Sequence, residues 1–319
     1  MLVLSQADVR AVLDTDRLID ALADAMADLS AGRASVPPRG AAFVQERGGL
    51  LAAMPAYLPS AQIVESKLVS LFPQNAGTAV PTHQAVIVAF DPENGSPVAL
   101  MDATYITEAR TAAGSALATR LLARDDAHVL AVLGTGVQAH AHARAVSRVR
   151  PFQEIRVAGR DRRKAEGMAE ALSNELPVSV TAAASMAEGM VGADVVCACT
   201  HSRDPVIRRA AVVPGMHITS IGYNVDGREV DAETVRDAVL LPQPSGSNDV
   251  NWASRDGLIG PDHIHAEVGE LVAGSKPGRT SADQITLYKS MGVGVQDAAA
   301  AALVLQGAKE RGLGIEVPV

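Results

Sequence analysis

A glycine-rich segment in the middle of the chain has residue types that suit phosphate binding. Residues 134–139 read Gly-Thr-Gly-Val-Gln-Ala, a G-x-G-x-x-A pattern. The first glycine permits a tight strand-to-helix turn, the second lets the backbone approach a pyrophosphate, and the small third residue allows close helix–strand packing. The helix N-terminus offers N–H groups to the anion. The pattern alone is a weak signal, but here it follows an apolar strand, opens a helix and precedes a second strand, which predicts a dinucleotide site. The predicted contacts are Gly134, Thr135, Gly136, Val137 and Gln138.

The end of the second strand bears on the choice between NAD and NADP. In dinucleotide-binding domains an acidic residue at this tip holds the ribose 2′-hydroxyl of NAD. Here Gly159 and Arg160 occupy the tip, and Asp161 comes slightly late. Arg160 could face a 2′-phosphate or stack on adenine, with a plain surface arginine as the alternative. The pattern weakly favours NADP and leaves NAD open.

The elements around this loop alternate between strand and helix. Helices are expected over residues 138–149 and 163–176. Apolar strands are expected at residues 129–133, 155–158, 178–180, 195–199, 217–221 and 238–241. Such alternation predicts an α/β, Rossmann-type doubly wound parallel sheet.

The N-terminal third has a different pattern. A helical stripe of apolar residues ends near Gly32, strands follow between residues 63 and 101, and an alanine-rich helix covers 107–123. A last helix over 297–311 could return to the first domain. We therefore predict an α+β substrate-binding and dimerisation domain (1–115), a dinucleotide-binding domain (116–296) and a C-terminal helix (297–319).

Composition excludes several classes of protein. The 319 residues carry a net charge of −8 without a basic block, and only 3% are aromatic, which argues against nucleic-acid partners. No apolar run approaches the roughly 18 residues that a membrane helix needs, and no signal peptide is evident. Cys197 and Cys199 are interpreted as buried thiols, in keeping with a reducing cytoplasm. The histidine pairs 140/142 and 263/265 do not share a helix face, so no metal site is expected.

Several further segments together carry a family resemblance. They are residues 67–70, 80–82, 95–102, 107–113, the loop at 134, 269–271, 276–279 and 286–292. Over nearly its whole length the chain resembles the ornithine cyclodeaminase and mu-crystallin family, which includes alanine dehydrogenases and ketimine reductases.

The resemblance implies a homodimer and a set of site residues. In this family the N-terminal domain, joined by the C-terminal helix, forms the dimer interface and holds the substrate. The residues matching the substrate-binding positions are Arg39, Met54, Lys67, Thr82 and Arg110. Asp226 matches the catalytic carboxylate, and Lys67 belongs to the catalytic set as well. The residues matching cofactor neighbours are Thr200, Ser202, Ser220, Ser290 and Gly292.

These residue types suit hydride transfer to an imine. Arginine binds an α-carboxylate with two parallel hydrogen bonds. A carboxylate such as Asp226 near the nitrogen favours the iminium, a better hydride acceptor than a neutral imine, and can move the proton. Without the resemblance, Lys67 and Arg110 would be read as surface charges, and Asp226 as a turn residue. The expected activity is an NAD(P)H-dependent imine reductase or L-amino acid dehydrogenase acting on a small imino or amino acid.

Two positions bear on the substrate. Ornithine cyclodeaminases carry a glutamate before a Met-Pro pair, whereas Ala53 stands there in this chain, which weakens ornithine as substrate. His83 and Gln84 follow Thr82 and could meet a second carboxylate, His83 in its protonated form, so iminosuccinate joins alanine-type imines as a candidate. A solvent-facing strand edge is the alternative for this pair. An ammonia-releasing cyclodeaminase and a crystallin-like NADP-binding protein without turnover remain the rival functions.

Overall fold

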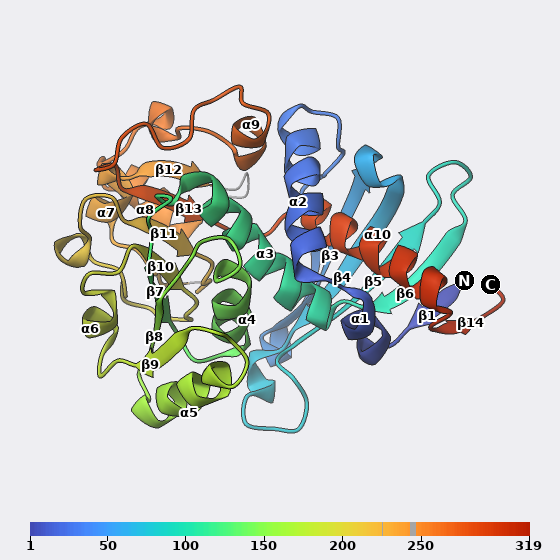
Figure 1. The fold of residues 1–319 in the computed structure, drawn as a ribbon. Helices are drawn as coiled ribbons and strands as arrows, with labels where there is room; N and C mark the ends of the chain where they lie inside the picture. The colour runs from blue at the N-terminus through green and yellow to red at the C-terminus, as the bar shows by residue number, and fades with distance from the viewer. Residues whose placement is uncertain (225, 243–246) are drawn as a thin grey trace. The chain divides into compact units, whose positions relative to one another are not determined.

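The computed structural model describes residues 1–224, 226–242 and 247–319. The chain divides into two compact units, one of residues 1–110 with 293–319 and the other of residues 111–292. The first division point lies within α3 (Thr104–Leu122), and the second lies just before α10 (Gly294–Arg311). Both lie a few residues before the boundaries at 115 and 296 expected from the sequence. Figure 1 traces the elements along the chain.

The first unit is built on a mixed seven-stranded sheet in the order β14-β1-β6-β5-β4-β3-β2. Strands β2 to β6 pair antiparallel in sequence order, and β1 adds parallel to β6. The strands are β1 (Leu2–Leu4), β2 (Gly40–Val44), β3 (Gly49–Leu58), β4 (Ile63–Leu71), β5 (His83–Phe90), β6 (Pro97–Asp102) and β14 (Ile315–Glu316). The remaining helices of this unit are α1 (Gln6–Val12), which begins at a Ser5–Asp8 capping box, and α2 (Thr15–Ser30).

The two faces of this sheet differ in their cover. Helix α10 contacts α2, β3 and β4, and α2 and α10 lie side by side (Figure 1). The covered face carries alternate residues of β3 and β4, among them the buried Met54 and Lys67. The opposite face carries Leu51 and Val86, which are 47% and 40% exposed. Antiparallel sheets commonly have one buried and one open face, and here the open face is partly apolar.

The second unit is built on a seven-stranded sheet whose strand pairs are all parallel, in the order β12-β13-β11-β10-β7-β8-β9. The strands are β7 (Val129–Leu133), β8 (Glu154–Ala158), β9 (Ser179–Ala182), β10 (Val195–Ala198), β11 (His217–Ser220), β12 (Val239–Pro242) and β13 (Thr286–Lys289). The helices besides α3 are α4 (Val137–Val146), α5 (Arg162–Ser173), α6 (Met186–Met190), α7 (Ala232–Asp237), α8 (Asn248–Arg255) and α9 (Val268–Val272). This arrangement confirms the predicted doubly wound fold, with the strand order reversing between β7 and β10.

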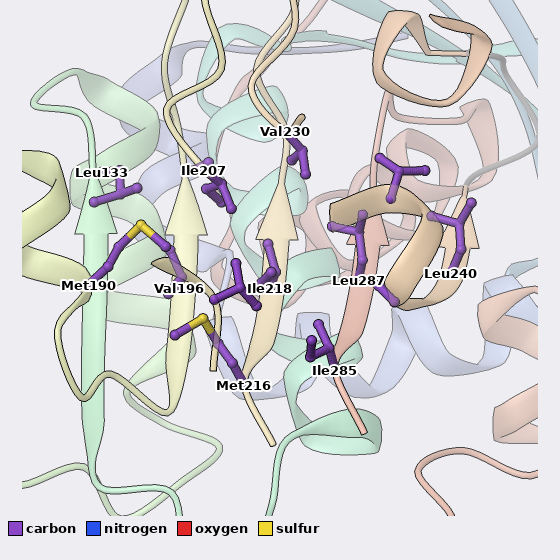
Figure 2. Packing of buried hydrophobic residues seen from close by; sticks show 14 of the residues in the cluster. Leu133, Met190, Val196, Ile207, Met216, Ile218, Val230, Leu240, Ile285 and Leu287 are labelled. Carbon is purple, nitrogen blue, oxygen red and sulfur yellow. The ribbon is translucent and has the colours of Figure 1, made fainter. Parts of the chain in front are cut away.

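The core of the second unit explains why its strands are continuous apolar runs. Figure 2 shows Leu133, Val196, Ile218 and Leu287 from neighbouring strands packing together, with Met190 of α6 against them. Strands of a parallel sheet are covered on both faces, so they alternate little between apolar and polar residues. Cys197 is fully buried in β10, as expected, whereas Cys199 is only half-buried. Among the described residues, no helix has the length and apolarity needed to cross a bilayer.

Candidate active site

The predicted dinucleotide loop lies at the carboxyl ends of β7 and β10. Gly134 has a φ of +127°, and its N–H donates to the Ala158 carbonyl oxygen at 2.8 Å. A Cβ atom at Gly134 would lie 2.5 Å from the Cys199 carbonyl oxygen, so glycine is needed there for both reasons. Gly136 is the N-cap of α4, and no described side chain caps this helix. The first N–H groups of α4 can therefore meet an anion, as a pyrophosphate site requires.

The tip of β8 lies beside this loop. A Cβ atom at Gly159 would lie 2.7 Å from the Thr135 side chain, so this glycine permits the close approach. Arg160, the next residue, is exposed. The Asp161 carboxylate accepts hydrogen bonds from the N–H groups of Arg163 at 3.0 Å and Lys164 at 3.3 Å, as the N-cap of α5. Asp161 therefore serves the helix, and Arg160 is the charged side chain presented at this tip.

A buried carboxylate joins the ends of β10 and β11. Glu229, only 2% exposed, accepts hydrogen bonds from the N–H and hydroxyl groups of Thr200 at 2.5 and 2.7 Å. It also accepts from the Ser220 hydroxyl at 2.8 Å and from the Gly222 N–H at 2.7 Å. The hydroxyl protons of Thr200 and Ser220, two expected cofactor neighbours, are thus directed to Glu229.

A buried lysine extends this network to β13 and α8. Lys289 Nζ donates to Ser220 Oγ and to the Gly222 carbonyl oxygen, both at 2.9 Å, and lies 2.9 Å from Asp249 Oδ2. Asp249 Oδ1 in turn accepts the N–H groups of Glu229 at 2.8 Å and of Val230 at 2.9 Å. The three charged side chains therefore tie the segments after β10, β11 and β13 into one unit.

The other expected residues of this unit lie on the same edge. Ser202 follows Thr200, and its N–H donates to Thr200 Oγ1 at 3.3 Å. Ser290 is buried, and its hydroxyl accepts the N–H of Gly292 at 3.3 Å. Gly292 has a φ of +71°, which favours glycine at this position. These residues shape the loops at the carboxyl edge, where sheets of this class bind dinucleotides.

Asp226 lies on the loop after β11 and is exposed. Its N–H donates to Asn224 Oδ1 at 3.0 Å, and Asn224 Nδ2 donates to the His201 carbonyl oxygen at 3.2 Å. Asn248 Nδ2 donates to the carbonyl oxygens of Asn224 at 2.7 Å and Gly227 at 3.2 Å. The main chain around Asp226 is thus held on both sides, while its carboxylate faces solvent.

In the first unit, Lys67 and Arg110 converge on one carboxylate, that of Asp297. Lys67 Nζ lies 2.7 Å from Asp297 Oδ2, and Arg110 Nε donates to Asp297 Oδ1 at 3.0 Å. Arg110 also donates to Gln296 Oε1 at 3.3 Å. The three charged residues are 2%, 6% and 0% exposed, respectively. We call Lys67, Arg110 and Asp297 the buried triad. Asp297 lies in the first turn of α10, where the helix dipole favours an anion.

A second acid, Glu65, lies next to the triad. It precedes Lys67 by two residues on the same face of β4, is 1% exposed, and neither carboxylate oxygen has a hydrogen-bond partner. Burial, together with the charge of Asp297, raises the pKa of Glu65 to about 9, although Lys67 opposes the shift. Glu65 is therefore neutral at pH 7.

Asp297 and Lys67 of the triad keep their charges at neutral pH. Burial raises the pKa of Asp297, but Arg110 and Lys67 outweigh this effect and hold it below its usual value. Burial lowers the pKa of Lys67 to about 8, against the opposing charge of Asp297. With Glu65 neutral, two cations face one anion, so the cluster has one positive charge in excess. A substrate carboxylate would balance that charge.

The structure separates His83 from Gln84. His83 lies on the face of β5 that also carries the buried Ala85, and its pKa is lowered by burial and by the charges of Lys67 and Arg110. Gln84 points to the opposite face and is exposed. Of this pair, only His83 lies on the sheet face that carries Lys67, so His83 remains the candidate for meeting a second carboxylate. For His83, the protonated form is disfavoured at neutral pH.

Strand register also changes the argument about ornithine. Met54 is buried and is the Cα partner of Lys67, so the two share a face. Ala53, the residue compared with the cyclodeaminase glutamate, therefore points to the other face of the sheet. Ala52 is the neighbour that shares the face of Lys67, and it too lacks a carboxylate. Neither Ala52 nor Ala53 supplies the carboxylate that the cyclodeaminase glutamate would offer to a distal ammonium.

Arg39 and Thr82, the remaining expected substrate residues, lie at the ends of strands. Arg39 is exposed immediately before β2, whose first residue, Gly40, is the Cα partner of Ala53. Thr82 is exposed immediately before β5, and its carbonyl oxygen accepts the Phe72 N–H at 2.9 Å. Within the described ranges no group of three or more His, Cys, Asp or Glu side chains is arranged to hold a metal ion.

The chain has counterparts over its whole length among known proteins. A sequence model of the ornithine cyclodeaminase/mu-crystallin family matches residues 1–312. The chain belongs to this family. Among its family relatives, the ketimine reductase mu-crystallin of Mus musculus is 38% identical over 291 residues, 90% of each chain.

Solved structures of other family members share the complete fold. The Δ1-pyrroline-2-carboxylate reductase of Thermococcus litoralis, in complex with NADH and L-proline, is 36% identical, with a TM-score of 0.95 over 99% of this chain and 100% of the other. An archaeal alanine dehydrogenase dimer with bound NAD is 31% identical, with a TM-score of 0.93 over 100% and 99%. The iminosuccinate reductase of Paracoccus denitrificans with NAD⁺ is 26% identical, also with a TM-score of 0.93 over 100% and 99%.

Several residues of this family member were not found by sequence reasoning. Gln296 and Asp297 carried a usable signal, since they are two polar residues in the first turn of an otherwise alanine-rich helix. Glu65 carried a weaker signal, because it is a charged residue at one of the alternating positions of β4 that are otherwise mostly apolar. Glu229 and Lys289 carried none, because their role arises from partners in other segments.

Proposed function

We propose that this protein is an NAD(P)H-dependent imine reductase that converts a small 2-imino acid to the amino acid. The observation that carries the proposal is the buried triad, in which two cations, Lys67 and Arg110, share the single carboxylate of Asp297. A buried charge is costly unless it is paired, so a site with one unbalanced cation favours an anionic ligand. The α-carboxylate of an imino acid supplies that charge.

Each residue of the proposed site has a separate task. Arg110 and Lys67 bind the α-carboxylate, and Asp297 holds both cations in position. Asp226 stabilises the iminium and transfers the proton at the nitrogen, as a carboxylate near a developing cation does. Met54 and Thr82 border the place where the substrate binds.

The residues at the carboxyl edge of the parallel sheet fit a dinucleotide. Gly134 cannot carry a side chain, and the N-terminus of α4 has no described side-chain cap, which together make a cradle for a pyrophosphate. Arg160 is the residue proposed to meet the adenosine ribose. When bound, the reduced nicotinamide supplies the hydride.

Among imino acids, we propose that those with a single carboxylate are preferred. Support comes from His83, whose lowered pKa leaves it neutral at pH 7 and so removes the charge that a second carboxylate would need. Δ1-Pyrroline-2-carboxylate and the imine of pyruvate fit this description. Iminosuccinate, which has two carboxylates, is the alternative substrate. It stays in the test because one structural relative is an iminosuccinate reductase.

The deciding experiment is a spectrophotometric screen at 340 nm with both NADH and NADPH. The substrates are Δ1-pyrroline-2-carboxylate, pyruvate with ammonia, oxaloacetate with ammonia, and L-ornithine with NAD⁺. Oxidation of the reduced cofactor by the first two would support the proposal. Release of ammonia from ornithine without net cofactor change would establish a cyclodeaminase instead, and cofactor binding without turnover on any substrate would favour a crystallin-like binding protein.

We also propose that the protein is a homodimer joined through the open face of the first unit's sheet. Leu51 and Val86 on that face are exposed apolar residues, and such patches mark interfaces in soluble proteins. The archaeal alanine dehydrogenase relative was solved as a dimer. Light scattering should therefore give twice the chain mass for the wild type and a shift toward monomer for Val86→Lys. An equal substitution at the exposed Val191 of the other unit is the control, and a monomeric wild type would refute the proposal.

A further inference from the structure

The buried network around Glu229 lies next to the loop that carries Asp226. The segments after β10 and after β11 run in close contact there, and two glycines make this possible. A Cβ atom at Gly222 would lie 2.2 Å from the Thr200 carbonyl oxygen, and one at Gly227 would lie 2.5 Å from the Arg203 Cα atom. Asp226 lies between these two glycines, so the position of its carboxylate depends on how the two loops are held together.

Glu229 is the group that holds them. One of its carboxylate oxygens accepts from Thr200 after β10, at 2.5 Å from the N–H, and the other accepts from Gly222 after β11, at 2.7 Å. Both oxygens of the Glu229 carboxylate thus have donors, from Thr200 on one side and from Ser220 and Gly222 on the other. Lys289 and Asp249 extend the network, because Lys289 donates to Ser220 and pairs with Asp249, which accepts the Glu229 N–H. The three charged side chains are 1–3% exposed, so water cannot replace a lost partner easily.

We propose that Glu229 is the positioning residue that fixes the Asp226-bearing loop for proton transfer. The proposal rests on the proposed function, in which Asp226 is the catalytic carboxylate. Glu229 itself does not touch the reacting atoms and acts only through the loop.

Four groups donate hydrogen bonds to Glu229, and their chemistry predicts that even the isosteric substitution Glu229→Gln disturbs the loops. The hydroxyls of Thr200 and Ser220 can rotate, but the N–H groups of Thr200 and Gly222 cannot, and each faces a different oxygen of Glu229. In Glu229→Gln the new NH₂ group must replace one of these oxygens and so point at a backbone N–H. One backbone donor is then left without an acceptor, and one of the two hydrogen bonds that hold the loops together through Glu229 is lost.

The test is a double-mutant cycle on the full chain with Glu229→Gln, Asp226→Asn and the double variant. A displacement of about 1 Å at a catalytic group can cost about 100-fold in rate, so Glu229→Gln should lower kcat by about 10- to 100-fold. The dissociation constant of NADH, measured by fluorescence, should rise by a smaller factor than kcat falls, because the Gly134 loop that would hold the pyrophosphate is retained even where the expected cofactor neighbours Thr200 and Ser220 shift. The double variant should turn over no more slowly than Asp226→Asn, because Glu229 acts through Asp226 alone.

Hydrogen exchange supplies a readout that does not depend on turnover. Peptides covering the Thr200 and Gly222 amides should exchange faster in Glu229→Gln, while those of the Gly134 loop should not. The matched control is Asp194→Asn at the amino end of β10, whose carboxylate accepts the N–H groups of His128 at 2.8 Å and Val129 at 3.0 Å. This control should lower thermal stability and leave kcat within about twofold of wild type, since the site lies at the other edge of the sheet.

The outcomes separate the two proposals. If Asp226→Asn keeps its turnover, the proposed role of Asp226 fails, and hydrogen exchange alone decides whether Glu229 holds the loop. If Asp226→Asn loses turnover while Glu229→Gln keeps it, positioning by Glu229 is refuted. Positioning by Glu229 is also refuted if the two losses in kcat multiply in the double variant. It is refuted too if amide hydrogen exchange at Thr200 and Gly222 is unchanged in Glu229→Gln.

Discussion

Lys67 Nζ lies 2.7 Å from Asp297 Oδ2, which joins the middle of β4 to the first turn of α10. Both side chains are almost fully buried, and Arg110 reaches the second oxygen of the same carboxylate. Asp297 therefore pairs with two buried cations at once. This relationship gives the site both its charge and its geometry.

Removing the charge of Asp297 should destabilise the protein strongly. Asp297→Asn leaves Lys67 and Arg110 as neighbouring buried cations, and loss of one partner from a buried ion pair costs about 3–5 kcal/mol. Urea unfolding measures the change in the free energy of unfolding. The comparison is Glu108→Gln, from the more exposed Arg10–Glu108 pair, which should cost less than about 1 kcal/mol. Similar losses in the two variants would mean that the triad is not an energetic unit.

Arg110→Lys should be far from conservative. Arg110 donates to Asp297 and Gln296 through separate nitrogens, and a lysine ammonium cannot reproduce this planar arrangement. We expect kcat/KM for the imino acid to fall by about 10-fold or more, with NADH affinity unchanged. Steady-state kinetics with cofactor titration measure both quantities. Substrate kinetics equal to those of the wild type would remove Arg110 from the carboxylate site.

The neutral Glu65 should make stability depend on pH. Its pKa is about 9 in the folded protein against an ordinary value of 4.5, so the unfolded chain releases a proton that the folded chain keeps. Its contribution is fully present below about pH 4.5 and is lost as pH rises, at up to about 1.4 kcal/mol per pH unit until pH reaches about 9.

Glu65→Gln tests this directly because glutamine cannot titrate. Thermal unfolding between pH 5 and pH 9 should show a steeper decline for the wild type than for the variant. The difference between the two should grow steadily toward alkaline pH. Parallel curves would mean that Glu65 is already ionised in the folded protein.

Arg160→Ala should shift cofactor preference toward NADH. A 2′-phosphate carries close to two negative charges at neutral pH, and a charge-assisted hydrogen bond to arginine contributes about 1.5–3 kcal/mol. The ratio of kcat/KM for NADPH to that for NADH should therefore fall by about 10- to 100-fold. Arg162→Ala serves as the control, because Arg162 pairs with Glu166 on the surface of α5 at 2.8 Å. A wild type that prefers NADH, with a ratio untouched by Arg160→Ala, would contradict this role.

His83→Val should distinguish substrates with one carboxylate from those with two. Because the pKa of His83 is lowered, we expect kcat/KM for Δ1-pyrroline-2-carboxylate and for the pyruvate-derived imine to change by less than about threefold at pH 7.5. The oxaloacetate-derived imine should be a poor substrate of both wild type and variant. A loss of tenfold or more confined to the oxaloacetate-derived imine would instead establish a dicarboxylic substrate held by His83.

Features that depend on nearby residues were predictable from the sequence. The strand, Gly134 and helix α4 follow one another in the chain, and their local sterics and periodicity indicate the dinucleotide loop directly. The parallel sheet follows from the regular alternation of apolar strands and helices. The similarity of the segments at Lys67 and Arg110 to those of the family likewise pointed to these two cations as candidates for binding the substrate carboxylate.

Only the tertiary structure decided which groups these cations meet. Asp297 is distant in sequence from Lys67 and Arg110, and no local pattern couples positions that become neighbours through long-range packing. Strand register placed Ala52 rather than Ala53, and His83 rather than Gln84, on the sheet face that carries Lys67. A shift of one residue moves a side chain to the other face of a sheet. The neutrality of Glu65 has the same origin, since a pKa depends on burial and on the charges that the fold brings near.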